Sequence, residues 1–234
     1  MRRKIGIITG SGPEAGLDLW QKILDENKKY LKDKFQGDLD APDVTVFSIP
    51  ELGDSMELEK NYNKVWQVLE KNVREICKRV DYFVIACNTL NLYVNKIEKI
   101  YLKHKFISTY DVVKDYLIEN SLEEASLIGA LPVIEMKEYS VFKPLQNDFS
   151  IEVPKNFKNV HNLIYDVKKY GGQNKSVVND FKNVVNSLES KNIFLACTEL
   201  PLINFECEDK NLIDVTQLLA QKLVQKSFES VNFK

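Results

Sequence analysis

The chain has 234 residues, of which 44% are hydrophobic and 28% are charged, and its formal net charge at pH 7 is −2. This composition is typical of a globular protein that buries a substantial core, and the charge balance gives no basic surface for nucleic acid or for an anionic membrane. The basic start at 1–4 is followed by a short apolar run at 5–8, too short for a signal peptide or a membrane span, so we expect a cytoplasmic protein.

The first predicted elements are a strand at 4–9, a turn at 9–12 and a helix that begins at Pro13. A second strand is predicted at 44–49, where Pro50 ends it. The long helix that follows has an apolar face that includes Cys77, which is therefore interpreted as a core residue. The first helix is predicted to pack on a sheet through apolar residues at helical spacing, namely Leu17, Trp20, Leu24 and Leu31.

Two apolar runs about half a chain apart end in the same way, at Cys87 and at Cys197. Each run reaches Ala-Cys and is followed at once by small hydroxyl or amide side chains. Such runs are typical of buried parallel strands, whose carboxyl ends form the ligand-binding edge of open α/β sheets. We therefore expect a duplicated fold in which one thiol from each half faces a shared cleft. Asn88 or Thr89 is placed to cap the next helix, whose N-terminus would favour the thiolate of Cys87.

The second half repeats the alternation of strands and helices. Strands are predicted at 106–108, 126–128, 149–153 and 193–197, and helical faces at 160–167 and 177–188. This alternation predicts mostly parallel sheets. A last helix at 215–223 lies beyond the second cysteine strand and can cross back to the first half. We expect an α/β protein of two tightly apposed lobes, the first formed by residues 1–112 and 214–234 and the second by residues 113–213.

The cysteines and histidines also limit the chemistry. The four cysteines are scattered without a CxxC pair, so we expect neither a disulfide framework nor a metal site. The two histidines, His104 and His161, are interpreted as surface residues. Two thiols that face each other can invert a carbon that bears an acidic hydrogen, because one thiolate removes the proton and the opposite thiol supplies another.

At these positions the sequence resembles a known family, the cofactor-independent aspartate/glutamate racemases, and aspartate racemase most of all, over about residues 4–220. The resemblance implies two Rossmann-like lobes related by pseudo-symmetry, a site in the cleft between them, an amino-acid substrate, no cofactor and a homodimer. The segments that carry it are Gly10-Ser11-Gly12-Pro13-Glu14-Ala15, Ala86-Cys87-Asn88-Thr89, Cys197-Thr198-Glu199-Leu200-Pro201-Leu202 and Ile213-Asp214-Val215-Thr216.

The resemblance also implies roles for single residues. It makes Cys87 and Cys197 the two acid/base thiols, whose sulfurs we expect about 7–9 Å apart, with the substrate carbon between them. Two of the implied contacts keep a second interpretation, since Glu199 can instead cap the following turn and Lys169 can be a solvated helix residue. The implied substrate-binding residues are Gly10, Ser11, Asn88, Thr89, Thr198, Glu199 and Lys169.

The sequence departs from the pattern of the family in three respects. Asn91 stands where members usually have His, and Ala130 and Val133 stand where members tend to have threonines that face the substrate. The loop after the second strand carries Glu51, Asp54 and Glu57 and no Arg, although aspartate-type members present an Arg there. An acidic loop opposes a dicarboxylic substrate, so an amino acid with a cationic side chain is an alternative to aspartate.

Two other functions stay open at this point. The first is a catalytically degenerate protein of the same fold that binds an amino acid without converting it. The second is a nucleotide-binding module, because Gly10-x-Gly12-x-x-Ala15 after a strand fits the dinucleotide fingerprint. That module lacks the expected acidic residue about 20 residues further on, and it leaves the two matched cysteine strands without a role.

Overall fold

The computed structural model describes residues 2–100 and 105–229, and in those ranges two parallel sheets form. The first has the order β2-β1-β3 and the second the order β5-β4-β6-β7, and all their strand pairs are parallel. The strands of the first sheet are β1 (Ile5–Thr9), β2 (Val44–Ser48) and β3 (Tyr82–Ile85), and those of the second are β4 (Glu124–Gly129), β5 (Ser150–Glu152), β6 (Asn192–Ala196) and β7 (Asn211–Asp214).

The two sheets repeat one topology. In each, the first strand in sequence lies in the middle, the second pairs on one side and the third on the other, so that β1, β2 and β3 correspond to β4, β5 and β6. The ends of β3 and β6 are therefore equivalent positions, and these are the strands that lead to Cys87 and Cys197. The prediction of an α/β fold with two lobes and parallel sheets is confirmed.

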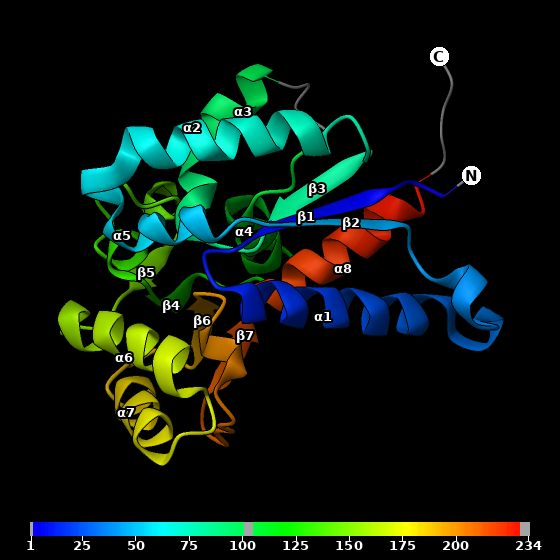
Figure 1. The fold of residues 1–234 in the computed structure, drawn as a ribbon. Helices are drawn as coiled ribbons and strands as arrows, with labels where there is room; N and C mark the ends of the chain where they lie inside the picture. Colours follow the sequence, from blue (N-terminus) through cyan, green and yellow to red (C-terminus); the bar gives the residue numbers. More distant parts are fainter. Residues whose placement is uncertain (1, 101–104, 230–234) are drawn as a thin grey trace.

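Helices cover the sheets on both sides (Figure 1). In the first lobe, one helix lies along one face of the sheet, and the first and last helices of the chain run side by side on the other (Figure 1). The last helix starts directly after β7 and packs on β3, so the predicted crossing back to the first lobe is confirmed. The helices are α1 (Pro13–Leu31), α2 (Leu58–Ile76), α3 (Val94–Ile100), α4 (Thr109–Glu119), α5 (Leu131–Ile134), α6 (Phe157–Tyr170), α7 (Lys175–Asn186) and α8 (Val215–Ser227).

The buried face of α1 differs from the predicted one. Leu17 is 65% exposed and Trp20 is 39% exposed, while Ala15, Leu19 and Ile23 are completely buried. The buried residues follow a spacing of four, which also forms a continuous stripe on a helix. Two apolar stripes therefore lie side by side on α1. Periodicity identifies both as helical, but the contacts with the sheet and with α8 decide which one is buried.

The other predicted faces and the core strands agree better with the structure. Cys77 lies in the core at the end of α2, where burial raises the pKa of its thiol to about 11 against a smaller opposite effect of Lys105. The strand predicted at 106–108 is reduced to one bridge between Phe83 and Phe106. Within the described residues, no helix has the length and apolar character needed to span a membrane.

Candidate active site

The two thiols lie at the carboxyl edges of the sheets, where β3 and β6 end. Cys87 is 8% exposed and Cys197 is 7% exposed. Several polar side chains are buried around them, although burying a polar group without a partner is unfavourable. This concentration of buried polar groups at one sheet edge marks the candidate site. Its buried polar residues are Ser11, Ser55, Asn88, Thr89, Thr198 and Glu199.

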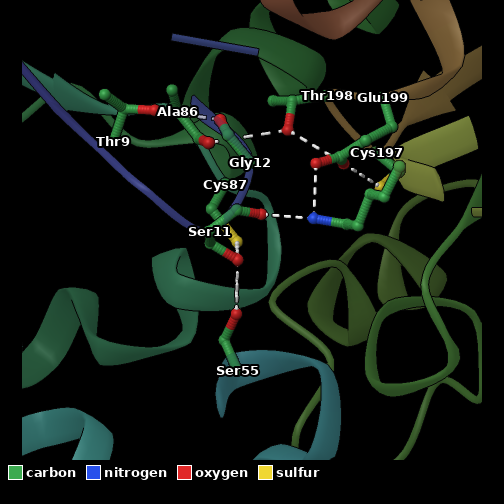
Figure 2. A network of polar contacts seen from close by, with 10 residues as sticks. Thr9, Ser11, Gly12, Ser55, Ala86, Cys87, Cys197, Thr198 and Glu199 are labelled. Atoms are coloured by element: carbon green, nitrogen blue, oxygen red, sulfur yellow. Dashed lines mark hydrogen bonds and ion pairs between the residues drawn. The ribbon is translucent and has the colours of Figure 1, made fainter. Parts of the chain in front are cut away.

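Cys87 is surrounded by hydroxyl groups. Its Sγ lies 3.5 Å from Ser11 Oγ and 3.8 Å from Ser55 Oγ, and the two hydroxyl oxygens lie 2.7 Å apart. Figure 2 shows these three side chains in one line of contacts. Because a hydroxyl both donates and accepts, this environment can accommodate either a thiol or a thiolate. Ser55 was not among the residues that the sequence pointed to, since a single serine in an acidic loop carries no recognisable motif.

Cys197 is surrounded differently. Its thiol donates to Glu199 Oε2 at 3.0 Å, and Thr198 Oγ1 lies 3.3 Å from the same oxygen (Figure 2). Burial, and then the adjacent carboxylate, raise the pKa of Cys197 well above its usual range. Cys197 is therefore a protonated thiol at neutral pH in the closed site.

Lys168 connects the two sides. Its Nζ lies 2.6 Å from Glu199 Oε1 and also donates to the backbone carbonyl of Ser11. Burial alone would lower the pKa of Lys168, but the Glu199 carboxylate outweighs that effect, so the pKa is raised. Negative charge on Cys197 or on Cys87 raises it further, which means that both sulfurs lie within electrostatic reach of this ammonium.

The lysine in the site is thus Lys168, and the assignment to Lys169 is wrong. The ammonium of Lys169 lies 4.8 Å from the centre of the Tyr170 ring, on the exposed side of α6. One residue corresponds to a rotation of about 100° around a helix, which separates the two lysines by more than a quarter turn. Lys168 and Tyr165 line the same depression as the first loop, residues 10–12 after β1. This stripe of α6 therefore faces the first lobe.

His161 lies one turn before Tyr165 on that stripe and is not a surface residue. It is half-buried, its Nδ1 accepts a hydrogen bond from the backbone N–H of Leu131, and its ring meets the Tyr165 ring edge-on. Burial lowers the pKa of His161, while Glu57 acts in the opposite direction. The other histidine, His104, lies outside the described residues.

Gly12 allows the first loop to approach Glu199. Its φ is +142°, and a Cβ atom at this position would lie 2.1 Å from Glu199 Oε1. Any side chain here would displace the carboxylate that holds Lys168 and Cys197. Gly10 and Ser11 precede it at the end of β1, so the predicted glycine loop and the second cysteine motif do meet.

Asn88 does not act as a helix cap. It precedes a 3₁₀ segment, Thr89–Tyr93, but its side chain makes no capping hydrogen bond, and neither polar atom of its buried amide has a partner. The prediction is therefore wrong for Asn88, and its amide is free to bind a ligand. Asn91, where the family has His, holds the backbone: its Nδ2 donates to the carbonyl of Cys87 and its Oδ1 accepts from the N–H of Thr109, both at 2.9 Å.

The substituted turn of the second lobe is apolar. Ala130 and Val133 are buried, and the N–H of Val133 donates to the carbonyl of Ala130 at the start of α5. No threonine hydroxyl can face the site from these two positions. The polar groups that surround the thiols therefore come from other elements, above all Ser55 and Lys168.

Two carboxylates of the acidic loop, Asp54 and Glu57, line the outer depression beside Lys168 but are paired with lysines, contrary to the expectation of unpaired charge from the sequence. The loop forms a 3₁₀ segment, Pro50–Glu57, in which Glu51 is exposed. Asp54 pairs with Lys64 of α2, and Glu57 pairs with Lys60, both at 2.7 Å. Because these two carboxylates pair with lysines of the following helix, α2, they leave no unpaired negative charge of their own beside the thiols.

A depression with a cavity volume of about 520 Å³ leads toward the site from outside. Ser11, Gly12 and Lys168 line it, and neither cysteine does. The contact between Lys168 and Ser11 therefore separates the depression from the buried thiols. A ligand that enters this way must displace the Lys168 side chain or the first loop.

No protein-family model matches the chain, and no curated protein matches its sequence. Solved structures do match. An aspartate racemase from Picrophilus torridus has a TM-score of 0.79 and 21% identity, covering 96% of this chain and 94% of that one. An aspartate racemase homologue from Pyrococcus horikoshii has a TM-score of 0.74 and 19% identity, covering 97% and 100%. A glutamate racemase from Francisella tularensis, in complex with D-glutamate, has a TM-score of 0.63 and 16% identity, covering 96% and 80%.

These likenesses bear out the fold that the resemblance implied. The chain folds as the two-lobe structure of aspartate and glutamate racemases, over nearly its whole length.

Proposed function

We propose that this protein is a cofactor-independent amino-acid racemase that uses Cys87 and Cys197 as its two acid/base groups. The observation that carries the proposal is the placement of two buried thiols after equivalent strands, joined by Ser11, Lys168 and Glu199. Core packing alone would not surround both sulfurs with buried polar groups.

The two thiols have different roles at the start of a turnover. Cys87, beside two hydroxyls, is the thiolate that breaks the Cα–H bond and takes the proton. Cys197, held as a thiol by Glu199, donates its proton to the opposite face of the carbanion. For the other enantiomer the roles are exchanged. The negative charge at the α-carbon spreads into the α-carboxylate, where fixed donors such as the amide of Asn88 stabilise it.

A zwitterionic amino acid suits the ion pair of Lys168 and Glu199, in which the Glu199 side chain is buried and the Lys168 side chain is partly exposed. Removing the lysine would leave a buried carboxylate unpaired, which is unfavourable. An amino acid can separate the pair without that penalty, since its carboxylate can bind Lys168 while its ammonium binds Glu199. We place the α-carboxylate near Asn88, Thr89 and Thr198, and the first loop at Gly10 and Ser11 closes over it.

Aspartate is the first substrate to test. The acidic loop no longer opposes a second carboxylate, because Asp54 and Glu57 are paired with lysines at the surface. Lys168 supplies a partly exposed cation beside the site, and the solved structures of the same fold are described as aspartate and glutamate racemases. The proposal includes a homodimer in the cytoplasm, with residues 1–112 and 214–234 as one lobe and 113–213 as the other.

The decisive experiment is α-hydrogen exchange. The purified protein is incubated with L-aspartate in heavy water without added cofactor, and deuterium at the α-carbon is followed by mass spectrometry together with the loss of optical rotation. Glutamate, lysine and arginine complete the panel. We expect exchange and racemisation of an acidic amino acid. A binding protein would instead show a rise in melting temperature with the amino acid and no exchange.

Two variants test the roles of the thiols. Cys87→Ser and Cys197→Ser should each lower racemisation by about 10²–10⁴-fold, because one face of the carbon loses its proton donor or acceptor. Cys77→Ser, which changes a core thiol on α2, is the matched control and should retain the parent rate. Circular dichroism shows whether each variant is folded. A folded Cys87→Ser or Cys197→Ser protein with the parent rate would exclude that residue as an acid or base.

A further inference from the structure

We propose that Ser55 is a positioning residue for Cys87: together with Ser11 it forms a pair of hydroxyls that reorients when Cys87 changes between thiol and thiolate. Its catalytic meaning depends on the proposed racemase function, but the contacts themselves do not.

Ser55 occupies an unusual place in its segment. Within Pro50–Glu57 it is 1% exposed, while the neighbouring carboxylates Asp54 and Glu57 turn to the surface. A 3₁₀ helix has three residues per turn, so residues three apart share one face. Leu52 and Leu58 lie three positions before and after Ser55 and are completely buried. A serine in the middle of this apolar face exchanges apolar packing for a hydroxyl, which indicates that the hydroxyl has a function.

The Ser55 hydroxyl contacts Ser11 and Cys87, the residues that the first lobe contributes to the site. Ser55 Oγ lies 2.7 Å from Ser11 Oγ and 3.8 Å from Cys87 Sγ, and Ser11 Oγ lies 3.5 Å from the same sulfur. The shortest of these contacts joins the two hydroxyls. Ser55 therefore acts on Cys87 mainly through Ser11.

The protons of this group can be counted in both states. When Cys87 is a thiol, its S–H donates to Ser11 Oγ, and the Ser11 hydroxyl donates to Ser55 Oγ. When Cys87 is a thiolate, the order reverses: Ser55 donates to Ser11 Oγ, and Ser11 donates to the sulfur. Each state follows from the other by rotation of two hydroxyl groups and transfer of the thiol proton to or from the substrate carbon, so no further reactant is required.

The hydroxyl pair gives Cys87 a hydrogen-bonding environment that differs from that of Cys197. The partner of Cys197 is a carboxylate, which only accepts hydrogen bonds and therefore favours the thiol. A hydroxyl pair can serve both states, and in the thiolate state the chain of donors stabilises the sulfur charge. Without Ser55, the Ser11 hydroxyl loses the donor that holds its own proton toward the sulfur.

The test is the rate at which iodoacetamide alkylates Cys87, measured by peptide mass spectrometry. In Ser55→Ala we expect alkylation at about pH 7 to slow by roughly tenfold, because hydrogen bonds to charged groups contribute at this level. The reference rate at about pH 10, above the ordinary pKa of a cysteine thiol, should change little. Ser140→Ala is the control: it removes a buried hydroxyl that donates to the carbonyl of Val133 and makes no hydrogen bond with Cys87, Ser11 or Ser55.

A double variant tests the route through Ser11. If Ser55 acts through Ser11, the variant Ser11→Ala/Ser55→Ala should react no more slowly than Ser11→Ala alone. Racemisation by Ser55→Ala should show a lower kcat with a nearly unchanged KM. An unchanged ratio of the alkylation rates at the two pH values, or additive effects in the double variant, would overturn the inference. Slower alkylation in a protein without racemase activity would support the positioning role and reject the proposed function, so the two failures are distinguishable.

Discussion

The two thiols of the site differ in what their hydrogen-bond partners can do. The hydroxyls beside Cys87 can donate to a thiolate, whereas the Glu199 carboxylate beside Cys197 can only accept from a thiol. A carboxylate near a thiolate also repels it, and after burial this repulsion is the next cause that raises the pKa of Cys197. In the proposed mechanism, Cys197 is therefore the thiol that supplies a proton, and Cys87 is the base.

This asymmetry predicts the pH dependence of alkylation at Cys197. A raised pKa means that the thiolate appears only as the pH rises well above the usual thiol range, so iodoacetamide should spare Cys197 at neutral pH and label it in alkaline solution. Glu199→Gln removes the carboxylate charge but keeps the shape, and it should speed the labelling of Cys197 at about pH 8 by roughly tenfold or more.

Cys77 provides the internal control for this experiment. Burial raises its pKa to about 11, and Glu199 is not among the groups that shift it, so the Glu199→Gln substitution should leave its labelling rate unchanged. Peptide mass spectrometry reports both cysteines from one sample. If Glu199→Gln labels Cys197 no faster than the parent protein does, the carboxylate does not control this thiol.

At the scale of the elements, the first loop and α6 are joined through Gly12, Glu199 and Lys168. We predict that Gly12→Ala breaks this junction, because its Cβ would lie 2.1 Å from Glu199 Oε1. The variant should lose most of its racemase activity, and its free energy of unfolding in urea should fall by about 2–4 kcal/mol from backbone strain and from the displaced ion pair.

Gly37→Ala separates the two causes of that loss. Gly37 has a similar φ of +133°, but a Cβ there would meet nothing within 4 Å. Its free energy of unfolding should fall by about 1–2 kcal/mol from backbone strain alone, with activity retained. Equal losses of stability and activity in both variants would show that the approach of Gly12 to Glu199 has no importance of its own.

The elements also show what a sequence can and cannot predict. The strands that end at Cys87 and Cys197 were predictable because a short apolar run followed by polar residues fixes both the strand and its edge. Lys168 was not, since neighbouring lysines on one helix differ by a rotation that depends on how α6 packs. The outward turn of Asp54 depends on Lys64, which lies in the next helix and forms no motif with it. The inward position of Ser55 results from the same orientation of this segment, so it could not be predicted from the sequence either.

In the whole molecule, the two lobes share one apolar core beneath the site. This core contains Ile5 and Val84 of the first sheet together with Leu127 and Phe194 of the second. The crossing of α8 to α1 adds a second connection (Figure 1). Wide separation of the lobes would expose this core, so we expect that a substrate enters by local movement of Lys168 and the first loop.

The two lobes have the same topology, but hydroxyl groups surround the thiol of the first and a carboxylate contacts the thiol of the second. This difference should affect the kinetics of the two enantiomers. Two enantiomers have the same free energy, so the equilibrium constant is one and kcat/KM must be equal in both directions. In the proposed mechanism, the enantiomer that presents its α-hydrogen to Cys87 meets Cys197 as the thiol, the form that its raised pKa favours. The other enantiomer needs a Cys197 thiolate, which is the minor state because the pKa of Cys197 is raised, and its apparent affinity falls by the fraction of protein in that state.

We therefore predict that one enantiomer of the substrate has the higher KM and, by the same factor, the higher kcat. With aspartate, initial rates from either enantiomer can be followed by circular dichroism across the saturating range. Because Glu199 adds to the effect of burial on Cys197, the variant Glu199→Gln should bring the two KM values closer together, whatever it does to the overall rate. Equal KM values for both enantiomers in the parent protein would mean that the two thiols share their proton evenly, and the assignment of Cys87 as the resting base would be wrong.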